Sequence, residues 1–228
     1  MRSLKRIALG GVLSAALLVA PATAALADVG ADDTANVSAS VSDNATGTAY
    51  KVIEVNWDAA NQQPVEPQYT WAEPIQAWVT ANYPDYINDD GSVSKSFEES
   101  LGDMGGLDAN RRPIDNGAAT FYDQLSEAIN SGAVSGLATE SSTMVDDNAN
   151  FTLGMGGYLV LFKGGDQVYR PSAVIVKPVW DEANQTWNLE DQDLTVKASE
   201  PNITKEVNDP QYMGDDQVQF TLRADVPV

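Results

Sequence analysis

The spacing of apolar residues predicts two groups of strands separated by helices. Residues 50–57 are rich in β-branched and aromatic side chains and predict a strand, whereas residues 58–68 contain Asn, Gln and two prolines and predict a turn. Glycines at 154–157 and at 164–165 mark turns between later apolar runs. These runs predict further strands, at residues 151–153, 158–162, 173–179, 186–189 and 194–197.

Three segments between the two groups of strands have apolar residues at helical spacing. The first two begin at residues 70–73 and 96–99, where Ser or Thr followed three residues later by Glu has the pattern of a capping box. The third has the clearest apolar face, which ends before Gly132 and consists of Phe121, Leu125, Ala128 and Ile129. A strand, a helical insertion and a series of strands together predict a mainly β fold, an immunoglobulin-like β-sandwich whose helices cover one end.

The N-terminal part of the chain has the pattern of an exported protein. Residues 1–27 contain three cations, then an apolar run of 13 residues, then small residues around Ala27, which predicts a cleaved bacterial signal peptide. Spanning a membrane takes about 18 apolar residues, and no later segment approaches that length. Residues 28–48 are small and polar and predict a flexible leader, so we expect the first folded domain to cover residues 49–199.

A second domain is expected to begin near Pro201. Residues 200–228 contain two further apolar runs, which predict strands at 203–207 and 218–224 joined by a polar connection. This segment is too short to bury a core of its own. We therefore expect the sequence to be the N-terminal part of a longer chain.

The composition excludes several classes of function. The formal net charge is -20, with 33 Asp and Glu against 13 Lys and Arg, so nucleic acid is not an expected partner. The chain has no Cys, so covalent bracing after export must use chemistry other than disulfides. It has no His either, which removes His-based triads and the usual zinc sites. We expect no cofactor and no metal, and the enzymes that remain are mostly carboxylate-dependent.

Lys205 is a candidate reactive residue because of its position in a predicted strand. Side chains alternate between the two faces of a strand, so Lys205 shares a face with Ile203 and Val207. A lysine on an apolar face is costly unless it is neutralised or consumed, for example in an amide with an Asn or Asp side chain. Burial would lower the pKa of the amine, and a nearby carboxyl group would shuttle protons. The alternative is an ordinary exposed lysine on an edge strand.

Residues 200–209 and 213–227 resemble the opening of the isopeptide-forming second domain of Gram-positive fimbrial shaft pilins. The shared features are Pro-x-x-x-Lys-x-Val, a Gly-Asp pair before a strand ending in aromatic-Thr, and a Val-Pro exit. Residues 49–52 and 156–160 resemble the pilin N-terminal module more loosely. The resemblance implies β-sandwich domains of the Cna-B type. It also implies an isopeptide bond from Lys205 to an Asn beyond Val228, with a catalytic Glu or Asp also beyond Val228.

The resemblance implies a second reactive lysine, to which a sortase links the next pilin. The family motif Trp-x-x-x-Val-x-Val-Tyr-Pro-Lys is incomplete here, because Trp187 and residues 194–197 preserve an aromatic residue, a strand and a lysine but lack Tyr-Pro. Lys197 is the preferred candidate, since it lies opposite Leu194 and Val196 in the predicted strand and would face solvent. Lys177, which precedes a proline, is the alternative. An ordinary surface lysine at position 197 is equally compatible with the sequence.

Three functions from different classes follow from these features. The first is a structural subunit of a sortase-assembled, cell wall-anchored pilus, braced by Lys-Asn isopeptide bonds, supporting adhesion, and having other pilin subunits as partners. The second is an adhesin whose first domain binds a host protein or glycan through the helical insertion or through tryptophans. The candidate tryptophans for a glycan surface are Trp71, Trp78, Trp180 and Trp187. The third is a secreted carboxylate-dependent hydrolase, although the acids show no recognisable acid-base pair. Lys51 shares a predicted face with Ile53 and leaves open an isopeptide bond in the first domain.

Overall fold

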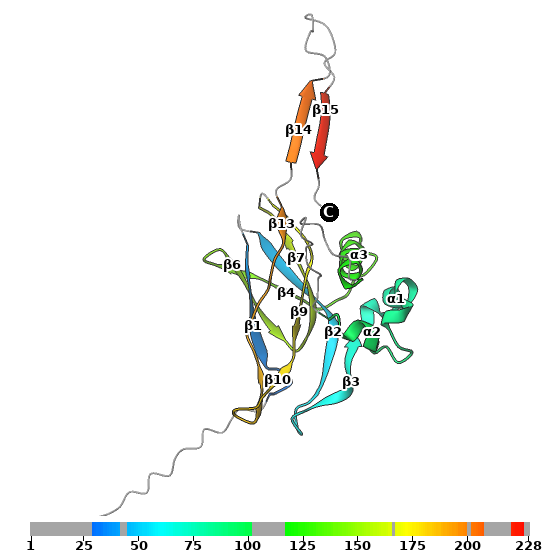
Figure 1. Cartoon of the computed structure of the whole chain (residues 1–228), viewed down its shortest axis with the longest axis vertical. Coiled ribbons are helices and arrows are strands. Elements are labelled where there is room, and N and C mark those ends of the chain that lie inside the picture. The colour runs from blue at the N-terminus through cyan, green and yellow to red at the C-terminus, as the bar shows by residue number, and fades with distance from the viewer. Residues whose placement is uncertain are drawn as a thin grey trace, which may run out of the picture.

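The computed structural model describes residues 29–41, 45–101, 117–165, 167–199, 202–207 and 220–225, and the predicted signal peptide lies outside these ranges. Two packed β-sheets form its main body (Figure 1). The larger sheet has the order β3-β2-β7-β9, with β4 also paired to β2. The smaller sheet has the order β12-β1-β6-β5. This architecture confirms the mainly β sandwich predicted from the sequence.

The strands of the two sheets have the following bounds. The larger sheet contains β2 (Thr46–Asp58), β3 (Gln63–Trp71), β4 (Thr139–Ser141), β7 (Gly156–Lys163) and β9 (Ser172–Val176). The smaller sheet contains β1 (Thr34–Ser40), β5 (Thr143–Val145), β6 (Asn148–Gly154) and β12 (Gln192–Asp193). Adjacent strands run antiparallel, except that β1 and β12 are parallel.

Apolar side chains that alternate along the strands hold the two sheets together. Val37 on β1 and Phe151 on β6 meet Val160 and Phe162 on β7 in one buried cluster. The rings of Phe151 and Phe162 lie 6.3 Å apart in an edge-to-face arrangement, which suits their quadrupoles. Gly47 on β2 leaves room for this pair, since a Cβ there would lie 2.5 Å from Phe151 and 2.8 Å from Phe162.

Strand β1 corrects the prediction of a flexible leader over residues 28–48. It pairs with β6 along residues 34–40, and β2 begins at Thr46. Ala35, Val37 and Ala39 on β1 are buried between the sheets. The period-two alternation of a strand is present in the sequence, but its inward residues are mostly alanines, so the polar composition of the segment concealed it. The first domain therefore begins well before residue 49.

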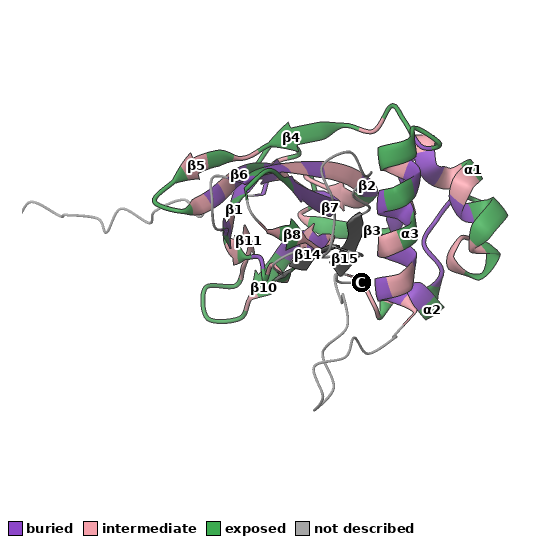
Figure 2. Ribbon diagram, turned by 90° about the horizontal axis from the view of Figure 1, so that it is seen from above, coloured by how far each residue is buried: buried purple, intermediate pink, exposed green. Residues whose placement is uncertain are grey.

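Helices cover the outer face of the larger sheet beside β2 and β3 (Figure 2). They are α1 (Glu73–Asn82), the 3-10 helix η1 (Pro84–Tyr86), α2 (Lys95–Glu98) and α3 (Ala118–Ser131). Their apolar residues form a second core with Leu159 and Leu161 of β7. Phe121 on α3 lies among the rings of this core and contacts Trp71, Trp78, Tyr83, Tyr86, Phe97 and Tyr122. The insertion thus covers a sheet face, whereas the sequence predicted cover at one end.

The helix ends agree with the sequence prediction for α3 and for α1, which ends before Pro84. Helix α3 ends at Gly132, whose φ of 79° places it in the left-handed conformation that glycine adopts without strain. The capping box predicted at residues 70–73 is wrong, because Thr70 belongs to β3 and its hydroxyl accepts a hydrogen bond from Asn56 instead. The helix predicted from residue 96 is a single turn that begins at Lys95.

Later elements lie outside the two main sheets. Strands β10 (Pro178–Asp181) and β11 (Thr186–Leu189) form a hairpin, and β8 (Val168–Tyr169) pairs with β13 (Ala198–Ser199). The strand predicted over 173–179 is divided at Lys177 into β9 and β10. In the second segment, β14 (Asn202–Val207) pairs with β15 (Phe220–Asp225), close to the predicted strands. None of the helices in the described ranges is sufficiently long and apolar to span a membrane.

We predict that Gly47→Ala destabilises the domain by about 1–3 kcal/mol, because the added methyl group would overlap the Phe151 and Phe162 rings. Denaturant unfolding followed by tryptophan fluorescence measures the effect. Gly154→Ala is the matched control, since its Cβ would meet its nearest neighbour at 3.9 Å. Equal stability of the two variants would contradict the proposed packing role of Gly47.

Candidate functional site

Lys177 lies at an interruption between two strands. Pro178 follows it and has no backbone N–H, so the strand that includes Val176 cannot continue its hydrogen-bond ladder through this position. The chain leaves the larger sheet here and enters the β10–β11 hairpin. The side chain of Lys177 is exposed, whereas Val176 and Pro178 on either side of it are buried. The local sequence therefore places one amine at the surface between two anchored neighbours.

Tyr69 holds the amine of Lys177 in place. The Lys177 Nζ donates a hydrogen bond of 3.2 Å to the Tyr69 hydroxyl and lies 5.8 Å from the centre of the Tyr69 ring. The Tyr69 side chain is buried and belongs to the core beneath the helices. Tyr69 is on β3 and Lys177 follows β9, and these are the two edge strands of the larger sheet. The contact therefore connects opposite edges of that sheet.

The Lys177 site offers an accessible primary amine with a defined position. Deprotonation would make this amine a nucleophile toward an acyl group. Hydrogen bonding to Tyr69 restricts its motion and so reduces the entropy lost when a second reactant is positioned beside it. Tyr69 was not identified from the sequence. No local spacing links it to Lys177, because the two residues are brought together only by the order of strands in the sheet.

The other candidate, Lys197, lies in a different setting from the predicted one. Residues 194–197 do not form a strand, and Lys197 is half-buried instead of fully solvent-facing. The backbone N–H of Leu194 donates to the carbonyl of Ser38 on β1 at 2.7 Å. This bond continues the parallel pairing with β1 one residue beyond β12, and the following residues up to Lys197 are not in a strand.

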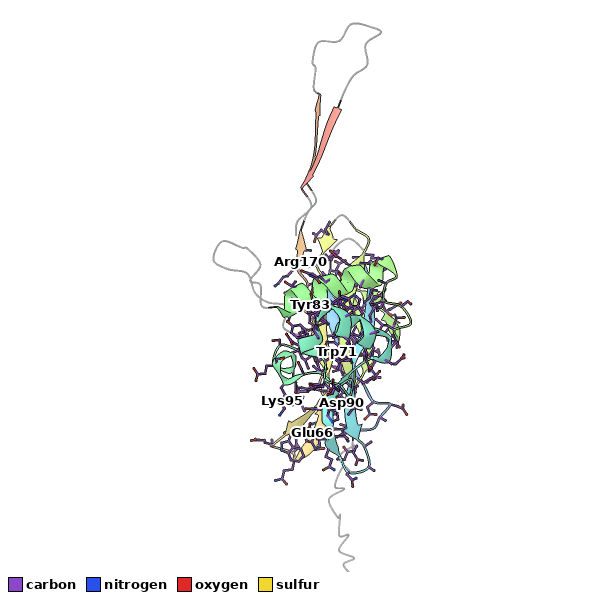
Figure 3. The ribbon with its side chains drawn as sticks, turned by 90° about the vertical axis from the view of Figure 1, so that its right-hand side faces the viewer. Glu66, Trp71, Tyr83, Asp90, Lys95 and Arg170 are labelled. Carbon is purple, nitrogen blue, oxygen red and sulfur yellow. The ribbon has the colours of Figure 1, made fainter. Side chains whose placement is uncertain are left out.

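Arg170 fixes the backbone at Lys197. The backbone N–H of Arg170 donates to the carbonyl oxygen of Lys197 at 2.9 Å, next to the short β8–β13 ladder. The guanidinium of Arg170 forms an ion pair of 2.6 Å with Asp123 on α3, near the end of the domain from which the second segment leaves (Figure 3). Arg170 therefore joins the helical layer to the last residues of the first domain. An isolated arginine in a turn gave no sequence signal for this role.

Lys51 has a carboxylate partner instead of an Asn. It forms an ion pair with Glu54, and 23% of its side chain is exposed. Its aliphatic part lies over Gly156, where a Cβ would approach the lysine Cε within 2.5 Å. The shared face with Ile53 predicted from parity is wrong, because β2 has a register irregularity between these two residues. These contacts give no support to an isopeptide bond at Lys51.

Tyr158 lies opposite Lys51 in the sheet and is almost completely buried. Its hydroxyl donates a hydrogen bond of 3.0 Å to the carbonyl of Gly154. Burial raises the pKa of Tyr158 to about 12, with smaller contributions from the negative charges of Glu54 and Glu140. The Tyr158 hydroxyl thus stays protonated, and its hydrogen bond to Gly154 stabilises the turn between β6 and β7.

Lys205 lies on β14, where its backbone pairs in register with Leu222 of β15. The strand predicted around it is confirmed. The residues that the resemblance assigns as its bond partner and its catalyst lie beyond Val228. The isopeptide role of Lys205 therefore stays a prediction.

Three turn carboxylates, Asp58, Asp90 and Asp181, differ from the acid of a glycosidase in the direction of their pKa shifts. Hydrogen bonds from Asn61, Ser92 and Asn184 lower the pKa values of the turn residues Asp58, Asp90 and Asp181, respectively. A glycosidase acid needs the opposite, a raised pKa, and a carboxylate partner across a cleft. Within the described ranges, no group of Asp and Glu is arranged to hold a metal ion. These three carboxylates accept backbone hydrogen bonds within their turns.

Two of the four tryptophans proposed for a glycan surface belong to the core. Trp71 is fully buried and its indole N–H donates to the carbonyl of Tyr86 at 2.8 Å. Trp78 packs against the same core from α1. Trp180 and Trp187 are on the β10–β11 hairpin, where Trp180 is exposed. Any tryptophan-based surface must therefore lie at that hairpin.

No protein-family model and no curated protein matches this chain. Among solved structures, it is similar to the T6 backbone pilin of serotype M6 Streptococcus pyogenes, described as a modular three-domain structure, with 18% identity and a TM-score of 0.51 over 86% of this chain and 36% of that chain. It also aligns with the full-length major pilin SpaD from Corynebacterium diphtheriae, with 15% identity and a TM-score of 0.39 over 87% of this chain and 38% of that chain.

The likeness to the T6 pilin shows a pilin-like fold for this chain. The lower TM-score of the SpaD alignment adds no weight to that conclusion. The chain spans little more than a third of the length of either pilin. The fold, and not the whole protein's activity, is what the two have in common.

We predict that the free energy of unfolding falls as the pH rises from about 10 to about 12, by an amount on the order of 2 kcal/mol from Tyr158 alone. The pKa of Tyr158 is raised in the folded state, so the unfolded chain loses the phenolic proton first and is favoured in this window. Chemical denaturation at several pH values measures the slope. In Tyr158→Phe the slope should be shallower, and identical slopes in both proteins would show that Tyr158 is not the group responsible.

Proposed function

We propose that this chain is the N-terminal part of a structural subunit of a pilus that a sortase assembles on the surface of a Gram-positive bacterium. The fold shared with the T6 backbone pilin over 86% of the chain is the observation that supports this most directly. In this proposal the predicted signal peptide exports the chain, and a signal outside this sequence anchors the polymer to the cell wall. The partners are other pilin subunits.

Lys177 is the acceptor for the next subunit in this proposal. Its amine attacks the thioester that joins the incoming subunit to the sortase, so that an amide forms, the carbon–sulfur bond breaks and the enzyme thiol is released. Exposure favours Lys177 over Lys197, because the side chain of Lys177 is exposed and that of Lys197 is half-buried. The hydrogen bond to Tyr69 gives the Lys177 amine a defined position. Tyr69 acts as a positioning residue, because it holds the amine without contacting the thioester.

Lys205 serves as the internal brace of the second domain. An amide from Lys205 to an Asn on a later strand would connect two distant parts of the chain, as a disulfide does in proteins that contain Cys. Such a bond resists reduction and slows unfolding under load. The absence of Cys from a chain of 228 residues with an export signal is consistent with this chemistry.

We predict that the producing cells display a ladder of covalent polymers and that Lys177→Arg abolishes it. Arginine keeps the positive charge but cannot act as the nucleophile, because its guanidinium stays protonated. Immunoblots of denatured cell-wall extracts measure the ladder. Lys197→Arg tests the second candidate, and Lys163→Arg is the control because Lys163 is another exposed lysine at the end of a strand.

A ladder that persists in Lys177→Arg but is lost in Lys197→Arg would reject Lys177 as the acceptor. The absence of any ladder from wild-type cells would reject assembly by a sortase.

We also predict an intact mass about 17 Da below the calculated value for protein extended through the complete second domain, since each isopeptide bond releases one ammonia. Mass spectrometry under denaturing conditions measures the deficit. It should disappear in Lys205→Ala and remain in Lys51→Ala. A wild-type mass equal to the calculated one, or a deficit that survives Lys205→Ala, would reject Lys205 as the bonded lysine.

A further inference from the structure

A six-residue pattern occurs twice in the first domain. Residues 57–62 and residues 180–185 both have the sequence Trp-Asp-x-Ala-Asn-Gln. The first copy forms the tip of the β2–β3 hairpin, and the second forms the tip of the β10–β11 hairpin. Both hairpins are drawn at the lower end of the domain in Figure 1, away from β14 and β15. The repeat is short and was not noticed in the sequence, because the two copies are more than 100 residues apart.

The two tips have the same internal geometry. In each, one oxygen of the Asp carboxylate accepts hydrogen bonds from the backbone N–H groups two and three residues later, at 2.9–3.2 Å. The other carboxylate oxygen accepts from the Asn side chain at 2.7 Å. Gln62 and Gln185 then adopt positive φ angles of 51° and 53°. The Asp and Asn residues of the repeat therefore stabilise the turns, whereas its tryptophans take no part in these hydrogen bonds.

Tryptophans bring the two tips together. Trp187 on β11 contacts Trp57 at 5.1 Å and Trp180 at 5.4 Å between ring centres, both edge to face. Trp57 is fixed by a 3.0 Å hydrogen bond from its indole N–H to the carbonyl of Val29. Packing between the hairpins accounts for Trp57 and Trp187. It does not account for Trp180, which is 45% exposed beside Val179, itself 38% exposed.

A pocket of about 380 Å³ opens next to Trp187. Asp32, Asp33, Thr34 and Asn188 supply oxygen acceptors along it, and the described residues of its lining include no Lys or Arg. The wall that carries Asp32 and Asp33 is anchored, because Gln62 binds the backbone of Val29 through two hydrogen bonds of 2.8 Å and 3.0 Å. The first copy of the repeat therefore shapes the pocket, and the second presents the exposed aromatic ring.

We propose that Trp180, Trp187 and this pocket form a binding site for a neutral saccharide. One face of a pyranose ring consists of C–H groups, which are attracted to the negative face of an indole ring. Its hydroxyl groups can donate hydrogen bonds to the carboxylates and the amide that line the pocket. The absence of a cation from the lining and the net charge of -20 select against sulfated or sialylated sugars.

The occupant is a sugar and not an apolar protein segment because polar acceptors line the pocket beside Trp187, whose ring contacts the exposed Trp180. A protein that covered Trp180 and the pocket together would bury the carboxylates of Asp32 and Asp33 without a cation among the lining residues to pair with them. Sugar hydroxyls satisfy such acceptors while the ring covers the indole. The site does not depend on assembly of a pilus, so its test uses the purified monomer.

The test uses lactose and N,N′-diacetylchitobiose as neutral probes and 3′-sialyllactose as an anionic probe. We expect the two neutral probes to shift the indole N–H resonances of Trp180 and Trp187 in NMR titrations and to show saturation transfer. Trp180→Ala should weaken binding about three- to tenfold, which corresponds to the loss of one aromatic contact. Trp180→Phe should restore part of that loss. Val145→Ala is the control, because Val145 is an exposed apolar residue on β5, outside the hairpins.

Asn188→Ala tests the pocket separately, because it removes an amide without removing an aromatic ring. We expect it to weaken neutral-sugar binding while thermal unfolding stays close to that of the wild type. No response to either neutral probe, a preference for 3′-sialyllactose, or unchanged affinity in both Trp180→Ala and Asn188→Ala would overturn the proposal. Concentration-dependent dimers lost in Trp180→Ala, without any sugar response, would assign the surface to a second copy of the chain instead.

Discussion

Strand β7 is buried from Gly156 to Phe162, on both faces of the larger sheet. Tyr158, Val160 and Phe162 belong to the core shared with the smaller sheet, whereas Leu159 and Leu161 belong to the core beneath the helices. An antiparallel sheet commonly has one face exposed to water. The larger sheet differs, because the side chains of β7 are apolar and buried on both faces. The helical insertion between β3 and β4 is therefore a structural requirement, because it covers the second face. Strand β7 therefore contributes side chains to both cores of the domain.

Because both faces of the larger sheet are covered, the groups available for chemistry lie at its edges and at the tips of its hairpins. Lys177 reaches the surface where Pro178 interrupts an edge strand, and Tyr69 secures its amine from the opposite edge. The exposed Trp180 lies on a hairpin outside both sheets. The proposed role as a pilus subunit would use such a rigid body with a few accessible points of attachment.

The sequence was most informative where burial is continuous or the helical period is strong. The unbroken apolar run of β7 and the apolar face of α3 identify their elements directly. Strand β1 was missed because its inward residues are small. The strand predicted at 194–197 was wrong, because these residues form the connection between β12 and β13. The contact between Lys177 and Tyr69 depends on the order of the strands in the larger sheet. The periodicity of side chains along one strand does not reveal which strands become neighbours. The sequence pattern placed Lys197 ahead of Lys177, whereas the proposal above prefers Lys177 because its side chain is the more exposed.

The central proposal is that this pilin-like domain is joined to its neighbour through the amine of Lys177. Tandem mass spectrometry of peptides from surface polymers tests it most directly, because a branched peptide identifies both joined residues. We predict that the peptide containing Lys177 carries, on its side-chain nitrogen, an acyl group from the C-terminal part of another subunit. Polymers in which Lys177 is unmodified throughout and another lysine carries the branch would contradict the proposal.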